Sequence, residues 1–134
     1  VSDTPSRPLT EGEYGPSRIN VATQRRDPHS LLNWFERLIR RRRECPELGF
    51  GELTLLDTGA DSVFAHRSDW EGETIVAVHE LSGRPVTARL PIEDGVALVD
   101  LFGHGEHPLP AELELEPYAA LWFRVRREGR RLPP

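Results

Sequence analysis

Apolar residues recur with helical spacing in one stretch of the chain. Five large apolar side chains occupy the i, i+3, i+4, i+7 and i+8 positions of one helical face: Leu31, Trp34, Phe35, Leu38 and Ile39. Asp27 and Pro28 precede this stretch as an N-cap and a first-turn residue, and Pro46 follows it. The pattern predicts an amphipathic helix from about Asp27 to Glu44, with arginines at positions 40 to 43 near its C-terminal end.

The apolar face of this helix needs a partner. Burial of a large apolar side chain is worth roughly 1.5 to 3 kcal/mol, and a whole domain is stable by only about 5 to 15 kcal/mol. Leaving the five side chains in water would therefore forgo a free energy comparable with the stability of a domain. We expect the face to be covered by the rest of this chain, by a second copy, or by a further domain.

After Gly49 the pattern changes to short apolar runs separated by turn residues, which is typical of antiparallel sandwiches and barrels. Strands are predicted at residues 52–56, 63–67, 74–81, 86–90, 97–102, 113–115 and 120–126. The run from Ile75 to Val78 is apolar throughout, which indicates a central strand covered on both faces. In the last strand, Phe123 is expected to face away from Trp122 and Arg124. The predicted fold class is mainly β, an antiparallel β-sandwich preceded by one amphipathic α-helix.

Composition and charge exclude several classes of function. The 134 residues suffice for one domain and are too few for a (β/α)8 barrel. The 17 basic residues, all arginine, are outnumbered by 22 acidic ones, so a net charge of -5 offers no basic field to nucleic acid or an anionic membrane. No apolar run has the roughly 20 residues of a membrane span, and residues 1–13 lack the apolar core of a signal peptide. We expect a cytoplasmic protein that binds neither nucleic acid nor membrane.

Two further observations concern the chain as a whole. The lone Cys45 has no partner for an intramolecular disulfide, which agrees with the cytoplasm. The sequence contains no methionine, which favours a fragment or a processed piece of a longer chain. Residues 1–18 are rich in Pro, Ser, Thr and charge and have little to bury, so we expect a mobile arm there.

Several segments together carry a resemblance to a known family. They are INVATQRRDPHSLLNWFERLIRRRRECPELGFGE at residues 19–52, IVAVHELSGRPVTARL at 75–90, VDLFGHGE at 99–106 and LEPYAALWFRV at 115–125. The first resembles the end of the catalytic barrel in trehalose synthase-like and alpha-glucosidase-like members of the alpha-amylase family, and the others resemble the β-domain that follows, domain C. The resemblance spans about Tyr14 to Arg126 and departs at His79-Glu80, where most relatives have an asparagine.

This resemblance implies how the chain is divided. Residues 1–26 would be a mobile arm and a remnant of a barrel loop, 27–48 the last barrel helix, 49–127 the antiparallel domain C, and 128–134 a tail. The family's retaining chemistry on α-linked glucose uses an Asp nucleophile, a Glu acid/base and a second Asp. In the family these residues lie upstream of the last barrel helix, and their motifs do not occur in this sequence. We therefore assign no catalytic residue and no cofactor.

Three residues are candidates for sugar binding. Trp70, in a predicted turn from Asp69 to Gly72, and Trp122 offer aromatic faces on which a sugar ring can stack, although such side chains more often pack in a core. Gln24 lies in the strand-to-helix loop that the resemblance places on the catalytic face of the barrel, and otherwise it is an ordinary loop residue.

One cluster, His104, Glu106 and His107, has the residue types of a metal site. Its spacing matches no known site, and a turn between strands explains it better. No metal is predicted.

The leading hypothesis is a non-catalytic C-terminal domain of an alpha-glucan-active enzyme, of trehalose synthase or alpha-glucosidase/alpha-amylase type. Its partner would be the catalytic barrel of the parent chain, which it would cover and stabilise, and alpha-glucans are a candidate ligand. One alternative is a free-standing carbohydrate-binding module that uses Trp70 and Trp122. Another is an interaction module that self-associates through the apolar face of the helix.

Overall fold

The computed structural model describes residues 12, 15–103 and 105–129. The helices in these ranges are α1 (Val21–Arg26), α2 (Leu31–Glu44) and α3 (Glu47–Phe50). The strands are β1 (Glu52–Leu56), β2 (Val63–Trp70), β3 (Glu73–Glu80), β4 (Val86–Leu90), β5 (Ala97–Asp100), β6 (Glu106–Pro108), β7 (Ala111–Leu115) and β8 (Ala120–Arg126). The chain divides between Arg43 and Glu44 into two compact units. Within the described ranges, no helix has the length and apolar character needed to cross a membrane.

The helical unit departs from the prediction at its start. A short helix, α1, occupies part of the stretch expected to be a loop, and Asp27 is its C-cap. The carboxylate of Asp27 accepts from the amide of His29, and α2 begins only at Leu31. The hydroxyl of Ser30 accepts from the amide of Asn33 at 3.3 Å, as a helix N-cap does. The predicted N-cap at Asp27 was therefore wrong, because a turn at residues 27–30 separates two helices.

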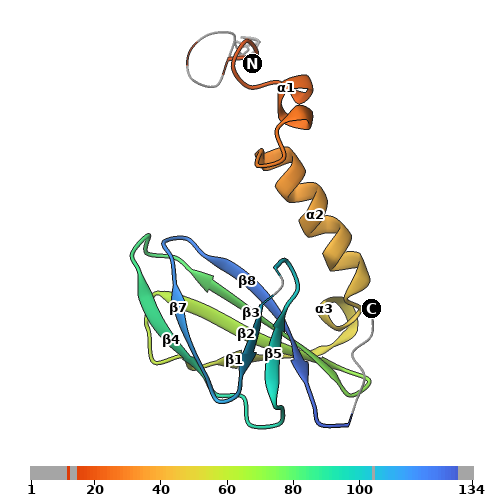
Figure 1. The fold of residues 1–134 in the computed structure, drawn as a ribbon, viewed down its shortest axis with the longest axis vertical. Coiled ribbons are helices and arrows are strands. Elements are labelled where there is room, and N and C mark those ends of the chain that lie inside the picture. Colours follow the sequence, from red (N-terminus) through yellow and green to blue (C-terminus); the bar gives the residue numbers. More distant parts are fainter. Residues whose placement is uncertain (1–11, 13–14, 104, 130–134) are drawn as a thin grey trace, which may run out of the picture. The chain divides into compact units, whose positions relative to one another are not determined.

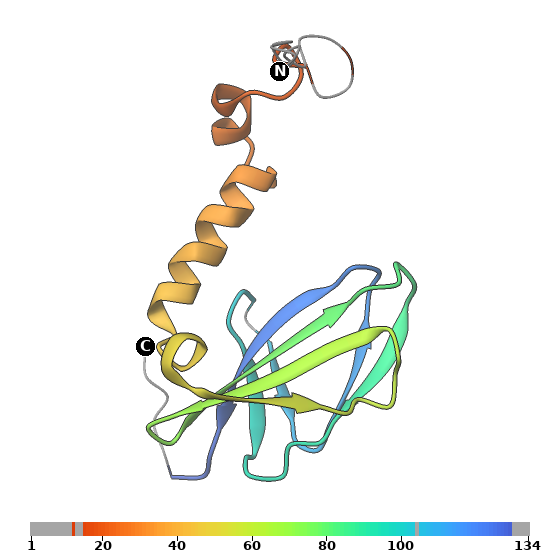
Figure 2. The same cartoon turned by 180° about the vertical axis from the view of Figure 1, so that it is seen from behind.

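The second unit is a two-layer β-sandwich (Figure 1). Its larger sheet has six strands in the order β1-β2-β3-β8-β5-β6, and its smaller sheet pairs β4 with β7. Every strand pair is antiparallel. Figure 2 shows β1, β2 and β3, drawn in yellow to green, running side by side in the larger sheet. The antiparallel sandwich, with a helix before it in the chain, confirms the predicted fold class.

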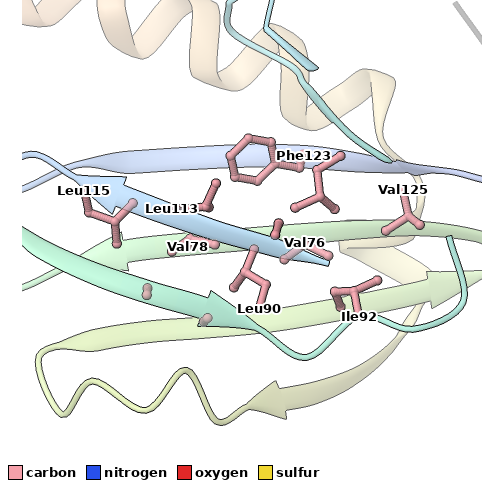
Figure 3. Close-up of a cluster of buried hydrophobic side chains, with 12 residues drawn as sticks. Val76, Val78, Leu90, Ile92, Leu113, Leu115, Phe123 and Val125 are labelled. Atoms are coloured by element: carbon pink, nitrogen blue, oxygen red, sulfur yellow. The ribbon is translucent and has the colours of Figure 1, made fainter. Parts of the chain in front are cut away.

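An apolar core fills the space between the two sheets (Figure 3). The larger sheet contributes buried side chains from β3 and β8, and the smaller sheet from β4 and β7. Figure 3 labels eight of the core residues: Val76, Val78, Leu90, Ile92, Leu113, Leu115, Phe123 and Val125. The alternation predicted for the last strand is confirmed, because Phe123 lies in this core and Arg124 lies on the opposite face of the sheet. The central position predicted for residues 75–78 is also confirmed, since β3 lies between β2 and β8.

In the sandwich unit, β2, α3 and β6 differ from the sequence prediction in ways that bear on its outer surface. β2 extends to Trp70, which was expected in a turn, because Trp70 still pairs with Glu73 of β3. The turn is confined to Glu71 and Gly72, whose φ angles of 49° and 78° are both positive. α3 and β6 were not predicted at all; β6 lies where a turn was expected, and it pairs with β5 over three residues.

A buried ion pair attaches α3 to the outer face of the larger sheet, the face turned away from the core. Arg124 Nη1 lies 3.1 Å from Glu47 Oε1, and the two side chains are 5% and 2% exposed. Arg124 Nη2 also donates to the sulfur of Cys45 at 3.7 Å. The second carboxylate oxygen of Glu47 accepts no hydrogen bond within the described chain. Charges removed this far from water interact strongly, so the pair holds α3 in one position.

A second buried carboxylate, Glu80, joins two loops at the other end of β3. It accepts hydrogen bonds from the amide and hydroxyl of Ser82, from the amide of Gly83, and from the amide of Tyr118. Burial raises the pKa of Glu80, but these hydrogen bonds outweigh burial and lower the pKa to about 2. Gly83 has a φ of +71°, and a Cβ there would lie 2.6 Å from the Tyr118 ring. The β3–β4 turn and the β7–β8 loop are therefore locked together.

Candidate functional site

The outer face of the larger sheet carries an uncovered apolar patch beyond α3. Strand pairing places Leu55, His66 and Trp122 in one row across the sheet, with Ala77 of β3 between the last two. We call the following residues the outer-face patch: Leu53, Leu55, Phe64, His66, His79, Phe102 and Trp122. The leucines and phenylalanines among them are exposed, and Leu55 is 65% exposed. The strand residues of the patch share this face because successive side chains of a strand point to opposite faces; their neighbours Ala65, Val78 and Phe123 lie in the core.

Aromatic rings pack against one another within the patch. The Phe64 ring centroid lies 5.6 Å from that of His66 and 6.4 Å from that of His79, while Phe102 lies 5.3 Å from Trp122. These contacts fix the orientation of large apolar side chains that still face solvent. The patch is therefore a preformed surface.

The two histidines keep the patch uncharged near neutral pH. Burial lowers the pKa of His66, and its Nδ1 atom has no hydrogen-bond partner within the described chain. Burial also lowers the pKa of His79, and repulsion from His66 lowers it further. Both imidazoles are thus mainly neutral at pH 7, and a neutral apolar face of this kind is typical of a protein interface.

The helical unit has an uncovered apolar face of its own. α2 contains no buried residue, and Leu31, Trp34, Phe35 and Ile39 are all exposed. The Trp34 and Phe35 rings touch edge to face at 5.1 Å. The predicted amphipathic stripe therefore exists, and the helical unit itself does not cover it.

The three sugar-binding candidates lie in three different local surroundings. Trp122 is half-buried inside the outer-face patch, against Phe102. Trp70 ends β2 and touches Phe50. Gln24 belongs to the helical unit, where its side-chain oxygen accepts from the amide of Leu32 at 3.0 Å and so caps the start of α2.

Two residues of the metal-like cluster, Glu106 and His107, have other partners. His104 lies outside the described residues. Glu106 forms an ion pair with Arg126, and His107 packs edge-on against Phe123 at 5.5 Å. In the part of the chain that the structure describes, no three His, Cys, Asp or Glu side chains gather as a metal site would require.

Sequence reasoning missed most of the patch. Leu53, Leu55, Phe64 and Phe102 were assigned to strands but not to a common face. The alternation Glu52-Leu53-Thr54-Leu55 carries part of the signal, whereas residues 63–70 do not alternate. It becomes readable only when the pairing of β1 with β2 shows which residues lie opposite each other.

Comparisons with known proteins give consistent results. No protein-family model matches the chain. Trehalose synthase from Thermus thermophilus is 34% identical over 126 residues, covering 89% of this chain and 13% of that protein. Trehalose synthase from Pimelobacter is 30% identical, over 84% of this chain and 21% of that protein. An alpha-glucosidase from Saccharomyces cerevisiae is 27% identical, over 81% of this chain and 19% of that protein.

The fold also matches solved structures. The trehalulose synthase MutB from Pseudomonas mesoacidophila superposes with a TM-score of 0.68 at 28% identity. The match covers 84% of this chain and 21% of the MutB chain. The chain thus spans about a fifth of the length of these proteins, or less.

Proposed function

Because the chain belongs to the alpha-amylase family, as a relative of its trehalose synthases and alpha-glucosidases, we propose that it is a non-catalytic C-terminal domain of an alpha-glucan-active enzyme. Its role is to cover and stabilise the catalytic barrel of that enzyme. The outer-face patch is the observation that carries this role, because it is a large apolar surface that the sandwich unit itself does not cover.

The lengths of the relatives support a partner within the same polypeptide. This chain matches between 13% and 23% of the length of the trehalose synthases and glucosidases, so most of each relative lies outside the matched region. The sequence lacks the carboxylate motifs of the family's catalytic barrel. A barrel elsewhere in the polypeptide would supply both the chemistry and the surface that the patch fits.

The exposed α2 stripe supports the same partner. In the family resemblance this helix is the last helix of the barrel, whose neighbours would cover Leu31, Trp34, Phe35 and Ile39. Full burial of each large apolar side chain contributes roughly 1.5 to 3 kcal/mol. The stripe and the patch together therefore offer the barrel a stabilisation on the order of several kcal/mol.

The proposal is tested by comparing this chain alone with the longer polypeptide that carries the barrel. Leu55→Arg places a charge in the patch, on the edge strand β1. It should leave the unfolding midpoint of the isolated chain nearly unchanged, because Leu55 is 65% exposed there. In the longer polypeptide it should lower the melting temperature by several degrees, since the charge would lose its water.

Thr87→Arg is the matched control, because Thr87 is an exposed strand residue on the outward side of the smaller sheet. It should shift neither melting temperature by more than about a degree, as is usual for surface substitutions. Equal effects of Leu55→Arg in the two contexts would contradict the docking role.

The activity of the longer polypeptide is part of the same proposal. It is expected to act on alpha-linked glucosides, and incubation with maltose followed by sugar analysis distinguishes isomerisation to trehalose from hydrolysis to glucose. We also infer a cytoplasmic location, which is supported by a cysteine count of one, too few for a disulfide within the chain, and is checked by cell fractionation.

A further inference from the structure

Two histidines lie among the apolar side chains of the outer-face patch. His66 on β2 lies opposite Leu55 of β1 on one side and Ala77 of β3 on the other. His79 on β3 lies opposite Phe64 of β2. The register thus makes the two imidazoles diagonal neighbours on one face of the sheet, and the Phe64 ring contacts both of them.

The charged groups of the surrounding elements have partners of their own. On β8 the residue opposite His79 is Ala120, and further along that strand Arg124 is paired with Glu47. Just beyond β1, the carboxylate of Asp57 accepts from the amide of the glycine two positions later. Among the described residues, no ion pair joins a carboxylate to either imidazole. A positive charge on one imidazole would therefore have an apolar surface and a second imidazole as its neighbours.

One ring nitrogen is poorly placed to carry a proton. The Nδ1 atom of His66 is buried and has no hydrogen-bond partner within the described chain. A protonated imidazole donates from both of its ring nitrogens. Protonation of His66 would therefore leave a charged N–H donor in the interior of the patch without an acceptor, which is far less favourable than an unpaired nitrogen on a neutral ring.

Covering the patch makes protonation still less favourable. Both histidines are only half-buried in the sandwich, so water still reaches part of each imidazole. A barrel that lies over the patch removes this water, and loss of water costs a charged imidazole much more than a neutral one. A proton bound to the undocked patch must therefore be released before docking. Well below pH 6.5, the ordinary pKa of histidine, the docking constant should fall by up to about tenfold per imidazole for each pH unit.

We propose that His66 and His79 form a pH-sensitive switch for docking, in which the sandwich holds the barrel while both imidazoles are neutral and releases it when they take up protons. The protons come from the solvent and add to the free ring nitrogens, and no other covalent bond changes. This inference rests on the proposed function, since it requires the barrel as the occupant of the outer-face patch.

The test compares the longer polypeptide that carries the barrel with the isolated chain, each unmodified and as His66→Gln/His79→Gln. Glutamine keeps a polar side chain but takes up no proton. Between pH 7.5 and pH 5.5, the double variant of the longer polypeptide should gain at least about 2 °C in melting temperature on its unmodified form. In the isolated chain the gain should be smaller, because the imidazoles there keep part of their water. Titration of other groups is common to both forms and cancels.

His107→Gln is the matched control, because His107 belongs to the same sandwich but packs against the core residue Phe123 and not in the patch. Its gain between the two pH values should be the same in both contexts. Circular dichroism of the isolated double variant checks that it folds. If it does not, His79→Gln alone provides the same comparison at about half the size.

Two results would overturn the switch, and they are distinguishable. If the double variant gains equally in both contexts while Leu55→Arg still reports docking at pH 7.5, the histidines do not control docking and the docking role stands. If Leu55→Arg reports no docking at pH 7.5, the docking role and the switch both fail.

Discussion

Removing the arginine from the buried ion pair should strongly destabilise the sandwich. In Arg124→Met, the Glu47 carboxylate would remain 2% exposed, and it already has one oxygen without a hydrogen bond. Loss of one partner from a buried pair costs about 3 to 5 kcal/mol, because an uncompensated charge stays in the interior. This is a large fraction of the roughly 5 to 15 kcal/mol that stabilises a domain of this size.

The assay is urea unfolding of the isolated chain at pH 7, followed by tryptophan fluorescence and circular dichroism. The midpoint should fall while the slope of free energy against urea stays constant, since the surface exposed on unfolding hardly changes. The double variant Glu47→Leu/Arg124→Met should recover most of the loss, because apolar groups of similar volume replace the pair without a stranded charge.

Arg126→Met is the control on the same strand. Arg126 pairs with Glu106, and both side chains are more than 40% exposed, so its loss should cost no more than about 1 kcal/mol. If Arg124→Met costs as little as Arg126→Met, or if the double variant is no more stable than the single one, the buried pair does not hold α3 as described.

Three further predictions follow from the other polar groups. Glu80→Gln should lower stability at pH 7 and flatten its acid dependence in urea titrations, because the Glu80 pKa of about 2 makes stability fall as pH drops from about 4.5 towards 2 in the unmodified chain. The melting temperature of His79→Gln, measured relative to the unmodified chain, should be higher at pH 5.5 than at pH 7.5. Burial lowers the pKa of His79 in the folded state, so the unfolded state binds more protons and the unmodified chain loses stability as pH falls below 6.5. Asp94→Asn should cost about 1 kcal/mol, less in 1 M NaCl, because Asp94 pairs with both Arg67 and Arg127 at a partly exposed site. The lowered pKa of Glu80 would be contradicted if Glu80→Gln had the same acid profile as the unmodified chain. The lowered pKa of His79 would be contradicted if the effect of His79→Gln did not change with pH. The ion pairs of Asp94 would be contradicted if the loss in Asp94→Asn did not change with salt.

Elements with a clear hydrophobic pattern could be predicted from the sequence. β1, β4 and β8 match their predicted ranges, since each has apolar residues at the period of a strand and turn residues at its ends. The amphipathic α2 was recognised for the same reason, although its start was placed too early. A proline at position 28 is compatible both with a first helical turn and with the turn that separates α1 from α2.

Features that depend on distant contacts could not be predicted. α3 has four residues, too few for a periodic signal, and it is held by Arg124 from the far end of the chain. β6 has three residues and is defined by its bonds to β5. Trp70 was recognised as a sugar-binding candidate, but its companion Phe50 is 20 positions away, and only the fold brings the two rings together. The outer-face patch required the register of β1 against β2 for the same reason.

The position of β8 has a consequence for biosynthesis. β8 lies between β3 and β5, so the β1-β2-β3 and β5-β6 parts of the larger sheet share no strand pairing without it. β3 ends at Glu80 and β8 at Arg126, a difference of roughly 46 residues. At about 5 to 20 residues per second, the ribosome leaves the inner edge of β3 open for several seconds. During that time the apolar strand Ile75 to Val78 offers an unpaired backbone to any neighbouring chain, and crowded polysomes are where this domain is most vulnerable to aggregation.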